Sequence, residues 1–510
     1  MNLFVKDKKG IVVLVGAGPG DEGLITVKGK TWLERADVVV YDHLANRNLN
    51  QHARPDAEII YAGKKSGQAT LTQDEINSFL VEKALEGKIV VRLKGGDPFI
   101  FGRGGEEVQF LKKADIPFAI VPGVTSSIGV SAYAGIPLTH RDFASSMSII
   151  TGSLGENKKA NEIEWDKIAT YAGTLIFLMG ARKLDLIVSQ LIKHGKSPDT
   201  PIAVIQSGTT PQQKTWTGTL STIEQVINKD VVSPPALTII GEVVKLKNTV
   251  DWFEQLPLFG KTVVLTRPKD QSESLIDLLQ GKGATPIIFP VVQDHPPVDW
   301  GQLDQALMNL SIYDGVFFSS GKGVQYFLNR LREKNLDIRE LKGLEIYSHG
   351  TKANEALEAL GIRVTPISNP SDAETLKKSM GKDKLAECRY LLPRAAKAPQ
   401  QLPGLLMELG AVVDTISVYQ SLPNCPKDTN FFESFGLGEI NVITFTSAET
   451  VNNFYKLTPK DLLPRLKESN IACIGPATAN AAKLLGLKVR IVSEQCTIEG
   501  LVEAMELHYL

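Results

Sequence analysis

The chain has 510 residues, which is enough for about three domains of ordinary size. Apolar residues make up 43%, and 56 Lys and Arg residues almost balance 57 Asp and Glu residues, for a net charge of −1. This composition excludes a disordered chain and gives no general attraction to nucleic acid or to anionic lipid. An anionic substrate would have to meet a local basic patch.

The cysteines and the apolar stretches exclude several further classes. The cysteines lie far apart in the second half, at Cys388, Cys425, Cys473 and Cys496. Since no CxxC pair occurs, neither a zinc site nor a redox pair is predicted, and the pattern is typical of a reducing cytosol. No signal peptide and no apolar stretch of about 18 residues is present. We therefore expect a cytoplasmic protein with no metal, no nucleic-acid partner and no membrane anchor.

The chain opens with a predicted buried strand and a glycine-rich turn. Five apolar residues, 11–15, predict a parallel strand, and Gly-Ala-Gly-Pro-Gly-Asp follows at 16–21. The turn resembles the start of a dinucleotide fingerprint, but Asp21 replaces the third glycine and Pro19 has no N–H to donate. The sequence therefore disfavours an NAD site. We expect a helix over 24–35 and then a strand over 38–41.

The stretch from Lys94 to Glu107 is the most informative of the first half. An apolar run over 89–93 leads into five glycines placed among charged and aromatic residues. Glycine costs conformational entropy, so this density predicts a backbone that bends sharply or lies against a ligand. Asp97-Pro98 predicts the start of a helix. A tight turn without a ligand is the alternative, and the charges of Arg103, Glu106 and Glu107 exceed what such a turn requires.

Several predicted strands of the first half end in polar turns. Asp42 follows the strand over 38–41, Lys64 follows a strand over 58–61, and Thr125 follows a strand over 118–121. The carboxyl ends of parallel strands share one edge of a sheet, so we expect these side chains to surround a ligand. The alternatives without a ligand are that Asp42 only caps the next turn and that Met179, at another strand end, packs in the core. A second α/β lobe is predicted after residue 140.

These motifs together resemble the uroporphyrinogen-III C-methyltransferases, within the tetrapyrrole methylase family, over about residues 10–250. The resemblance rests on seven segments that occur in order: 16–21, 40–42, 63–64, 94–107, 121–125, 135–142 and 179–180. It implies S-adenosyl-L-methionine as methyl donor, with S-adenosyl-L-homocysteine as product. It also implies uroporphyrinogen III as acceptor, methylated twice to give precorrin-2 for the sirohaem or cobalamin branch.

The resemblance also implies roles for individual residues. Asp42 matches the proposed proton acceptor, Lys64 the proposed proton donor, and Arg103 a tetrapyrrole-binding residue that is also a candidate base. Glu106 and Arg141 match further tetrapyrrole-binding positions. The expected donor contacts are Pro19, Gly95, Gly96, Asp97, Ile100, Thr125, Ser126, Met179 and Gly208. A substrate with many carboxylates calls for such arginines, because guanidinium binds carboxylate through two hydrogen bonds.

The second half contains an internal repeat. Arg267 lines up with Arg394, Gly283 with Gly410 and Ser320 with Ser447, each at an offset of 127 residues (394−267, 410−283, 447−320). A constant offset predicts duplicated α/β units with parallel sheets. Two such lobes would form a hinged clamp.

This half resembles uroporphyrinogen-III synthase over about residues 261–510, on the segments 265–268, 318–320, 417–419, 445–447 and 474–479. The family closes linear hydroxymethylbilane with inversion of ring D and without a cofactor, and each of its lobes is discontinuous. Tyr419 matches a tyrosine proposed to help the hydroxyl leave, although a tyrosine at a strand end is more often structural. Ser320, Ser447 and Thr478 are expected to donate to substrate carboxylates.

We therefore expect a bifunctional α/β enzyme with a two-lobed methylase fold followed by a two-lobed synthase. The expected boundaries are 1–248 for the methyltransferase (lobes 10–140 and 141–248), 249–260 for a linker, and 261–510 for the synthase (lobes 261–294 plus 424–510, and 295–423). A homodimer through the methyltransferase half is also implied by the resemblance. The alternatives are a methylase with a different acceptor and an inactive or regulatory synthase-like domain, or a non-catalytic ligand sensor.

Overall fold

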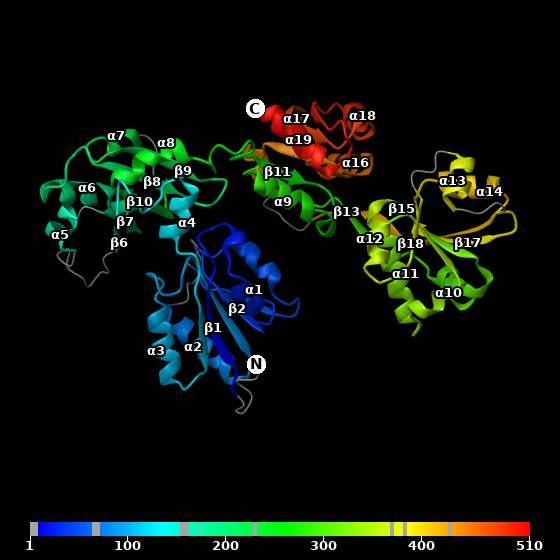
Figure 1. The fold of residues 1–510 in the computed structure, drawn as a ribbon, viewed down its shortest axis with the longest axis horizontal. Coiled ribbons are helices and arrows are strands. Elements are labelled where there is room, and N and C mark those ends of the chain that lie inside the picture. The colour runs from blue at the N-terminus through cyan, green and yellow to red at the C-terminus, as the bar shows by residue number, and fades with distance from the viewer. Residues whose placement is uncertain are drawn as a thin grey trace. The chain divides into compact units, whose positions relative to one another are not determined.

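The computed structural model describes residues 9–63, 72–152, 163–171, 173–227, 232–367, 372–380, 385–426 and 431–510. The chain forms two compact units (Figure 1). The first comprises the residues up to Lys261 together with Leu279–Thr285 and Tyr509–Leu510, and the second comprises Thr262–Leu278 and Pro286–His508. In the described ranges, every helix is too short or too polar to cross a membrane. The same ranges contain no group of three or more side chains suited to hold a metal ion.

The first sheet is parallel and has the order β3-β2-β4-β1-β5. Its strands are β1 (Ile11–Gly16), β2 (Val38–Tyr41), β3 (Glu58–Tyr61), β4 (Ile89–Lys94) and β5 (Phe118–Val121). The helices between them are α1 (Val27–Leu33), α2 (Gln73–Leu85) and α3 (Gly104–Lys113). Both faces are buried: Val12 and Leu14 belong to one apolar cluster, and Val13 and Val15 belong to another. This explains the continuous apolar run of β1.

Two predicted helices differ from the observed ones at their amino ends. The helix expected over 24–35 is a short 3-10 turn, Glu22–Leu24, followed by α1, because the side chain of Thr26 accepts a hydrogen bond from Gly29 N and starts α1 there. The helix expected at Asp97 begins seven residues later, at Gly104, as α3. The intervening segment is a loop closed by a hydrogen bond of 3.0 Å from Gly104 N to Pro98 O.

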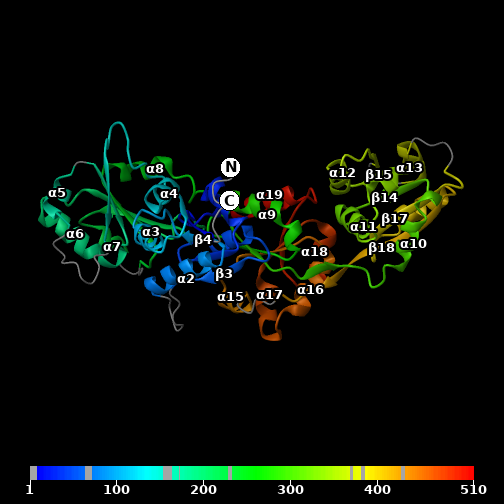
Figure 2. The ribbon, with the colours of Figure 1, turned by 90° about the horizontal axis from the view of Figure 1, so that it is seen from below.

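The second sheet of the first unit is mixed, with the order β6-β7-β10-β8-β9. Its strands are β6 (Met147–Thr151), β7 (Thr174–Leu178), β8 (Pro201–Gln206), β9 (Lys214–Thr219) and β10 (Ala236–Ile240). Only the β6–β7 pair is parallel; the β7–β10, β10–β8 and β8–β9 pairs are antiparallel. Helices α5 (Trp165–Thr170), α6 (Leu184–Lys193) and α7 (Ile223–Ile227) accompany the sheet (Figure 2).

Helix α4 (Ser126–Tyr133) links the two lobes of the first unit, and the segment after the second sheet packs against its end. Val130 of α4 lies in the apolar cluster of the second sheet. After α8 (Lys247–Val250), Trp252 donates from Nε1 to Ala132 O at 2.9 Å, and the rings of Trp252 and Phe253 pack edge-on against Tyr133. Part of the predicted 249–260 linker is therefore held against the first unit.

The second unit contains two sheets, with orders β12-β11-β19-β20-β21 and β13-β18-β17-β14-β15-β16. The first is built from β11 (Thr262–Leu265), β12 (Thr285–Ile288), β19 (Val442–Phe445), β20 (Asn470–Cys473) and β21 (Val489–Val492). The second is built from β13 (Val292–His295), β14 (Gly315–Phe318), β15 (Glu345–His349), β16 (Thr365–Ile367), β17 (Arg389–Ala395) and β18 (Val412–Pro423). The β13–β18 pair is antiparallel. Parallel pairing joins β11–β19, β19–β20, β20–β21, β14–β15, β14–β17, β15–β16 and β17–β18.

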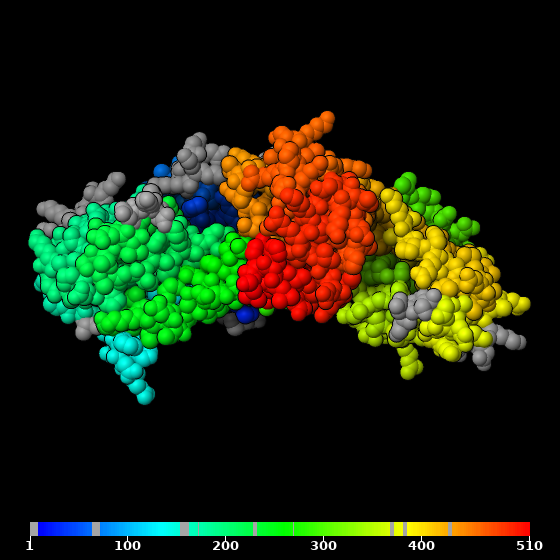
Figure 3. Space-filling model, turned by 90° about the horizontal axis from the view of Figure 1, so that it is seen from above, coloured from blue at the N-terminus to red at the C-terminus, as the bar shows by residue number. Residues whose placement is uncertain are grey.

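The helices of the second unit follow the strands in the order expected for parallel sheets. They are α9 (Glu273–Gly281), α10 (Gly301–Met308), α11 (Gly321–Glu333), α12 (Thr351–Glu358), α13 (Ala373–Met380), α14 (Gln401–Glu408), α15 (Phe431–Leu437), α16 (Ala448–Leu457), α17 (Leu463–Glu468), α18 (Pro476–Leu484) and α19 (Ile498–Tyr509). The segment that carries β19, β20 and α16–α19, orange to red, forms one continuous body in the space-filling view (Figure 3).

The sheet orders show how the sequence repeat is folded. The order β11-β19-β20-β21 in one lobe corresponds to β17-β14-β15-β16 in the other. Strands β11 and β17 begin 127 residues apart (389−262), as do β14 and β19 (442−315). Each lobe therefore combines a strand from one copy of the repeat with three strands from the other copy. As a result, β11 lies beside β19, with Val263 opposite Val442.

Candidate functional site

The loops that leave β1, β4 and β5 touch one another at the carboxyl edge of the first sheet. Gly18 N donates to Gly96 O at 3.2 Å, and Gly96 N donates to Gly18 O at 2.7 Å. A Cβ atom on Gly16 would lie 2.4 Å from the Cα of Gly123, and one on Gly123 would lie 2.3 Å from Gly96 O. The glycines therefore serve the close approach of three loops, which any side chain would prevent.

Asp97 ties two of these loops together instead of capping a helix. Its Oδ1 accepts from Phe99 N at 2.8 Å, which makes an Asx turn, and its Oδ2 accepts from Gly123 N at 3.0 Å. The predicted helix start at Asp97 is therefore wrong, because the carboxylate satisfies a loop N–H two residues ahead and a second N–H from the next strand end. Its position at the junction of the β4 and β5 loops makes Asp97 a structural anchor of this edge.

Helix α4 brings the two lobes of the first unit together at the same place. A Cβ on Gly129 would lie 2.7 Å from Pro19 Cγ, and a Cβ on Gly208 would lie 2.3 Å from Val130 Cγ1. Asp21 N also donates to Thr209 Oγ1 at 3.1 Å. Six of the predicted donor-binding residues therefore gather around the start and one face of α4: Pro19, Gly96, Asp97, Thr125, Ser126 and Gly208. Gly95 packs against Leu44, in the loop after β2.

Two further predicted donor contacts lie on exposed loops. Ile100 is 39% exposed and Met179 is 52% exposed, and no described contact joins either side chain to the group around α4. Met179 has φ 55°, an unusual conformation for a non-glycine residue. Among the described residues, nine non-glycine residues have positive φ, and five of them lie on these loops: Phe101, Arg103, Met179, Ser207 and Thr209. Such strain gathers at functional sites.

Asp42 lies directly after β2 and uses its two oxygens differently. Oδ1 accepts from Leu44 N at 3.1 Å and from Ala45 N at 3.2 Å, so it does cap the next turn. Oδ2 lies 3.5 Å from Nη2 of Arg92, and the side chain remains 27% exposed. The carboxylate is thus held by the turn on one side and has an oxygen beside a buried guanidinium on the other. This geometry leaves one oxygen available to a ligand.

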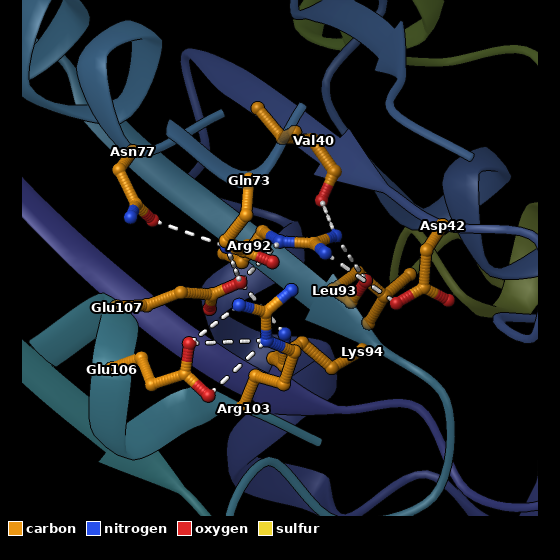
Figure 4. A network of polar contacts seen from close by, with 10 residues as sticks. All are labelled: Val40, Asp42, Gln73, Asn77, Arg92, Leu93, Lys94, Arg103, Glu106 and Glu107. Carbon is orange, nitrogen blue, oxygen red and sulfur yellow. Dashed lines mark hydrogen bonds and ion pairs between the residues drawn. The ribbon is translucent and has the colours of Figure 1, made fainter. Parts of the chain in front are cut away.

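Behind Asp42 lies a buried cluster of charges that the sequence did not predict (Figure 4). Glu107 is fully buried, and its Oε1 accepts from Lys94 Nζ at 2.8 Å, Arg92 Nε at 3.4 Å and Gln73 Nε2 at 3.1 Å. Burial, with the charge of Arg92 next in importance, lowers the pKa of Lys94. The available signal was Arg92 itself, a charged residue inside the run 89–93 that we treated as apolar.

Two of the predicted tetrapyrrole-binding residues, Arg103 and Glu106, lie on the surface near this cluster. Arg103 pairs with Glu106, with Nη2 and Oε2 2.6 Å apart, and both side chains are more than half exposed. The hydrogen bond with Glu106 raises the pKa of Arg103, which disfavours a role as a base. Arg141 is exposed in a loop whose ends are joined by hydrogen bonds between His140 and Ala144. Lys64 lies outside the described residues.

A cleft of about 400 Å³ lies in the second unit, at the carboxyl edge of the sheet that contains β11 and β19. Arg267 follows β11 and lines the cleft, as do Ser447 after β19 and Ile474 after β20. Asp294 and Ser421 come from the two long segments that connect the lobes, and Lys352 comes from α12 of the other lobe. The cleft thus collects side chains from both lobes of this unit.

The predicted synthase residues fall into three situations. Ser320 caps α11 by accepting from Gly323 N at 3.0 Å, and its Oγ lies 3.3 Å from the hydroxyl of Tyr419. Ser447 caps α16 in the equivalent way, by accepting from Thr450 N at 3.2 Å, and lines the cleft. Thr478 is buried in α18 and is absent from the described cleft lining. The structure thus brings Ser320 and Tyr419 together and places Ser447 in the cleft.

This fold defines a two-part α/β protein in which polar loops gather at the carboxyl edge of a sheet in each part. Residues 11–224 match the family described as Tetrapyrrole (Corrin/Porphyrin) Methylases, and residues 273–503 match the family described as Uroporphyrinogen-III synthase HemD. The chain is 37% identical to the porphyrin biosynthesis protein HemD of Ruminiclostridium josui, over 97% of each chain. It is 42% identical to the uroporphyrinogen-III C-methyltransferase of Bacillus subtilis, over 72% of this chain and 74% of that protein.

The crystal structure of a Thermus thermophilus uroporphyrin-III C-methyltransferase with S-adenosyl homocysteine covers 46% of this chain and all of that chain, at 39% identity and a TM-score of 0.40. From the similarity over the full length, the chain belongs to the tetrapyrrole methylases fused to uroporphyrinogen-III synthase.

Proposed function

We propose that the chain carries out two consecutive steps of tetrapyrrole biosynthesis. The second unit closes hydroxymethylbilane to uroporphyrinogen III with loss of water, and the first unit transfers two methyl groups from S-adenosyl-L-methionine to that product to give precorrin-2. The observation that carries the proposal is the 37% identity over 97% of the chain to a relative with the same two parts. The product feeds the branch toward sirohaem or cobalamin.

The loops around α4 are the proposed donor site. A Cβ atom on Gly96 would meet no atom closer than Ser126 N at 3.6 Å, so a flat nucleoside could lie against the backbone there, whereas Gly95 and Gly208 make room for Leu44 and Val130. In the transfer, a pyrrole carbon forms a bond to the methyl group while the sulfur–methyl bond breaks and S-adenosyl-L-homocysteine leaves. Placement of the two reactants in line supplies much of the acceleration. Ile100, Met179, Thr125 and Ser126 complete the proposed donor contacts.

Asp42 is the proposed acceptor of the proton that the methylated ring sheds. Its Oδ1 is engaged by two backbone N–H groups, so the carboxylate is fixed in place, and Oδ2 remains accessible. General-base catalysis of this kind contributes about 10²- to 10⁴-fold. Arg92 lies behind Asp42, with its Nη2 3.5 Å from the Asp42 Oδ2. Lys64 is the proposed proton donor.

The acceptor carboxylates require cations at the rim of the site. Arg103 and Arg141 are exposed, and Glu106 holds Arg103 in one orientation. Because a guanidinium pairs with a carboxylate through two hydrogen bonds, Arg103 is the proposed anchor of one acetate or propionate side chain. In the second unit, Ser320, Ser447 and Thr478 are the proposed donors to the bilane, and Tyr419 is the proposed donor to the leaving hydroxyl.

A coupled assay tests both activities in one experiment. The purified chain is supplied with hydroxymethylbilane and S-adenosyl-L-methionine, and the products are oxidised and separated. Dimethylated, fluorescent product supports both steps. Uroporphyrin I alone would contradict the synthase step, and unmethylated uroporphyrin III would contradict the methyltransferase step.

Analytical ultracentrifugation of the same sample tests the proposed homodimer through the first unit, and fractionation of the source cells tests the proposed cytoplasmic location.

A further inference from the structure

Two arginines of the second unit, one buried and one partly buried, lack a carboxylate partner among the described residues. Arg394 is 6% exposed, and its Nε and Nη1 have no hydrogen-bond partner; Nη2 donates to the carbonyl of Pro399. Arg267 is partly buried, its Nε is buried without a partner, and its Nη2 donates to Gln271 Oε1 at 3.3 Å. Neither arginine forms an ion pair with any described residue. Arginine cannot lose its proton in a protein, so both guanidinium groups remain charged.

The usual arrangement in the same unit is different. The guanidinium of Arg330 binds Asp304 through two hydrogen bonds of 2.7 Å, and that of Arg389 lies 2.8 Å from Asp414. Burying a charge without such a partner is unfavourable, so folding alone gives no reason to keep it. Burial is also the main cause that lowers the pKa of Arg267 and of Arg394.

The two arginines occupy equivalent places in the two lobes. Arg267 follows β11 and Arg394 lies in β17, which correspond in the sheet orders and are 127 residues apart (394−267). Arg267 lines the cleft together with Ser447, the cap of α16. In the other lobe, β17 lies between β14, which leads to the equivalent cap Ser320, and β18, where Tyr419 is opposite Ala395. Each lobe thus offers one arginine beside one helix-capping serine.

We propose that Arg267 and Arg394 each bind one carboxylate group of a linear polycarboxylate substrate, so that the substrate is held once by each lobe. The proposal rests on the proposed synthase function. A carboxylate would complete the unpartnered guanidinium nitrogens by two hydrogen bonds, and two anchors in different lobes would bring the ends of a flexible chain toward each other before ring closure. The cleft also contains Asp294 and Glu449; Asp294 is engaged by Lys322 and Ser421.

The test compares Arg267→Gln and Arg394→Gln with the surface control Arg339→Gln. Arg339 pairs only with the neighbouring Asp337 and is 87% exposed. We expect each buried variant to raise the KM for hydroxymethylbilane by about tenfold or more, the loss expected for hydrogen bonds to a charged group, whereas Arg339→Gln leaves KM unchanged. Methylation of added uroporphyrinogen III by the same preparations should be unaffected. Because an unpartnered charge is removed, Tm should be unchanged or higher in the buried variants.

Two outcomes would overturn the proposal. One is a KM within twofold of the unmodified chain in both buried variants; the other is a raised KM that accompanies a lowered Tm in both, which would indicate structural arginines. If the unmodified chain closes no ring, the proposed function fails separately, and a second measurement decides on the arginines. It is hydrogen exchange with a linear octacarboxylate bilane that lacks the leaving hydroxyl. The proposal is supported if the bilane protects the segments around residues 267 and 394 in the unmodified chain and this protection is lost in the variants. It is overturned if the bilane protects neither segment in the unmodified chain.

Discussion

The Nζ of Lys94 lies 2.8 Å from Oε1 of Glu107, and the other carboxylate oxygen of Glu107 is buried without a hydrogen-bond partner. Arg92 is the second cation beside the same carboxylate, at 3.4 Å. Two buried cations therefore depend on one buried anion. Arg92 in turn reaches Asp42, so the cluster connects the interior of the first sheet with the proposed proton acceptor.

Glu107→Gln is expected to destabilise the first unit strongly. The substitution keeps the shape of the side chain but leaves Lys94 and Arg92 without the charge that compensates them, and breaking a buried pair in this way costs about 3–5 kcal/mol. Denaturant unfolding of the full chain, followed by a signal from the first unit, measures the effect. The adjacent Glu106 is the matched control, because it is 58% exposed and pairs only with Arg103.

We expect Glu106→Gln to change the free energy of unfolding by about 1 kcal/mol or less, since exposed pairs contribute little. Equal losses in the two variants would show that the buried cluster has no special role in stability. Activity is not the readout here, because Glu106 is itself a proposed substrate-binding residue.

Asp42→Asn should separate the two uses of the Asp42 carboxylate. An asparagine oxygen can still accept from Leu44 N and Ala45 N, so the turn and the stability should be retained. The amide cannot accept the ring proton, so methylation should fall by about 10²- to 10⁴-fold. Donor binding by calorimetry and ring closure by the second unit should remain. A variant that methylates normally would mean that Asp42 only caps the turn.

Arg103→Ala is expected to remove most methylation at low acceptor concentration and to leave ring closure intact. If Arg103 anchors a carboxylate, as its raised pKa and its pairing with Glu106 favour, the loss should be in KM. Arg103→Lys should restore part of the affinity, because a charge without the planar fork remains. Steady-state kinetics with varied uroporphyrinogen III makes the distinction. A fall in kcat alone, with KM unchanged, would instead favour a role for Arg103 in proton transfer.

The sequence predicts the first sheet and the meeting of its loops at one edge well, and the reason is physical. Apolar runs such as 11–15 can only be satisfied in a sheet that is covered on both faces, and parallel strands must present their carboxyl ends together. The gathering of Pro19, Gly96 and Thr125 follows from this rule. The prediction that Asp97 caps a helix was wrong because its carboxylate accepts a hydrogen bond from a loop N–H instead. The local sequence does not distinguish a helix cap from a loop cap.

Contacts between distant segments are beyond such local patterns. Ser320 and Tyr419 are 99 residues apart in sequence and 3.3 Å apart at their hydroxyl oxygens. The pairing of β11 with β19 was expected only through the family resemblance, because the repeat by itself would place each copy in its own lobe. The buried cation at Arg92 was missed because it stands in a strand that is otherwise mostly apolar. Arg394 served only to mark the repeat, and its burial was not predicted.

Asp304 gives a prediction for the pH dependence of the second unit. The side-chain hydrogen bond from Arg330 is the main cause that lowers the pKa of Asp304 from the ordinary 3.8 to about 2. A hydrogen bond from Lys334 and the positive charges of both residues contribute to the same shift. A carboxyl whose folded pKa is lowered stabilises the protein above its unfolded pKa, and this contribution is lost as pH falls through the folded pKa. Asp304→Asn should therefore lower Tm near neutral pH, and the difference from the unmodified chain should shrink between pH 3.8 and about 2.

Glu333→Gln, which removes an exposed partner of the same Arg330, is the control and should change Tm little at any pH. A difference in Tm between Asp304→Asn and the unmodified chain that stays constant across this pH window would show that the ionised carboxylate of Asp304 is not the source of the stabilisation.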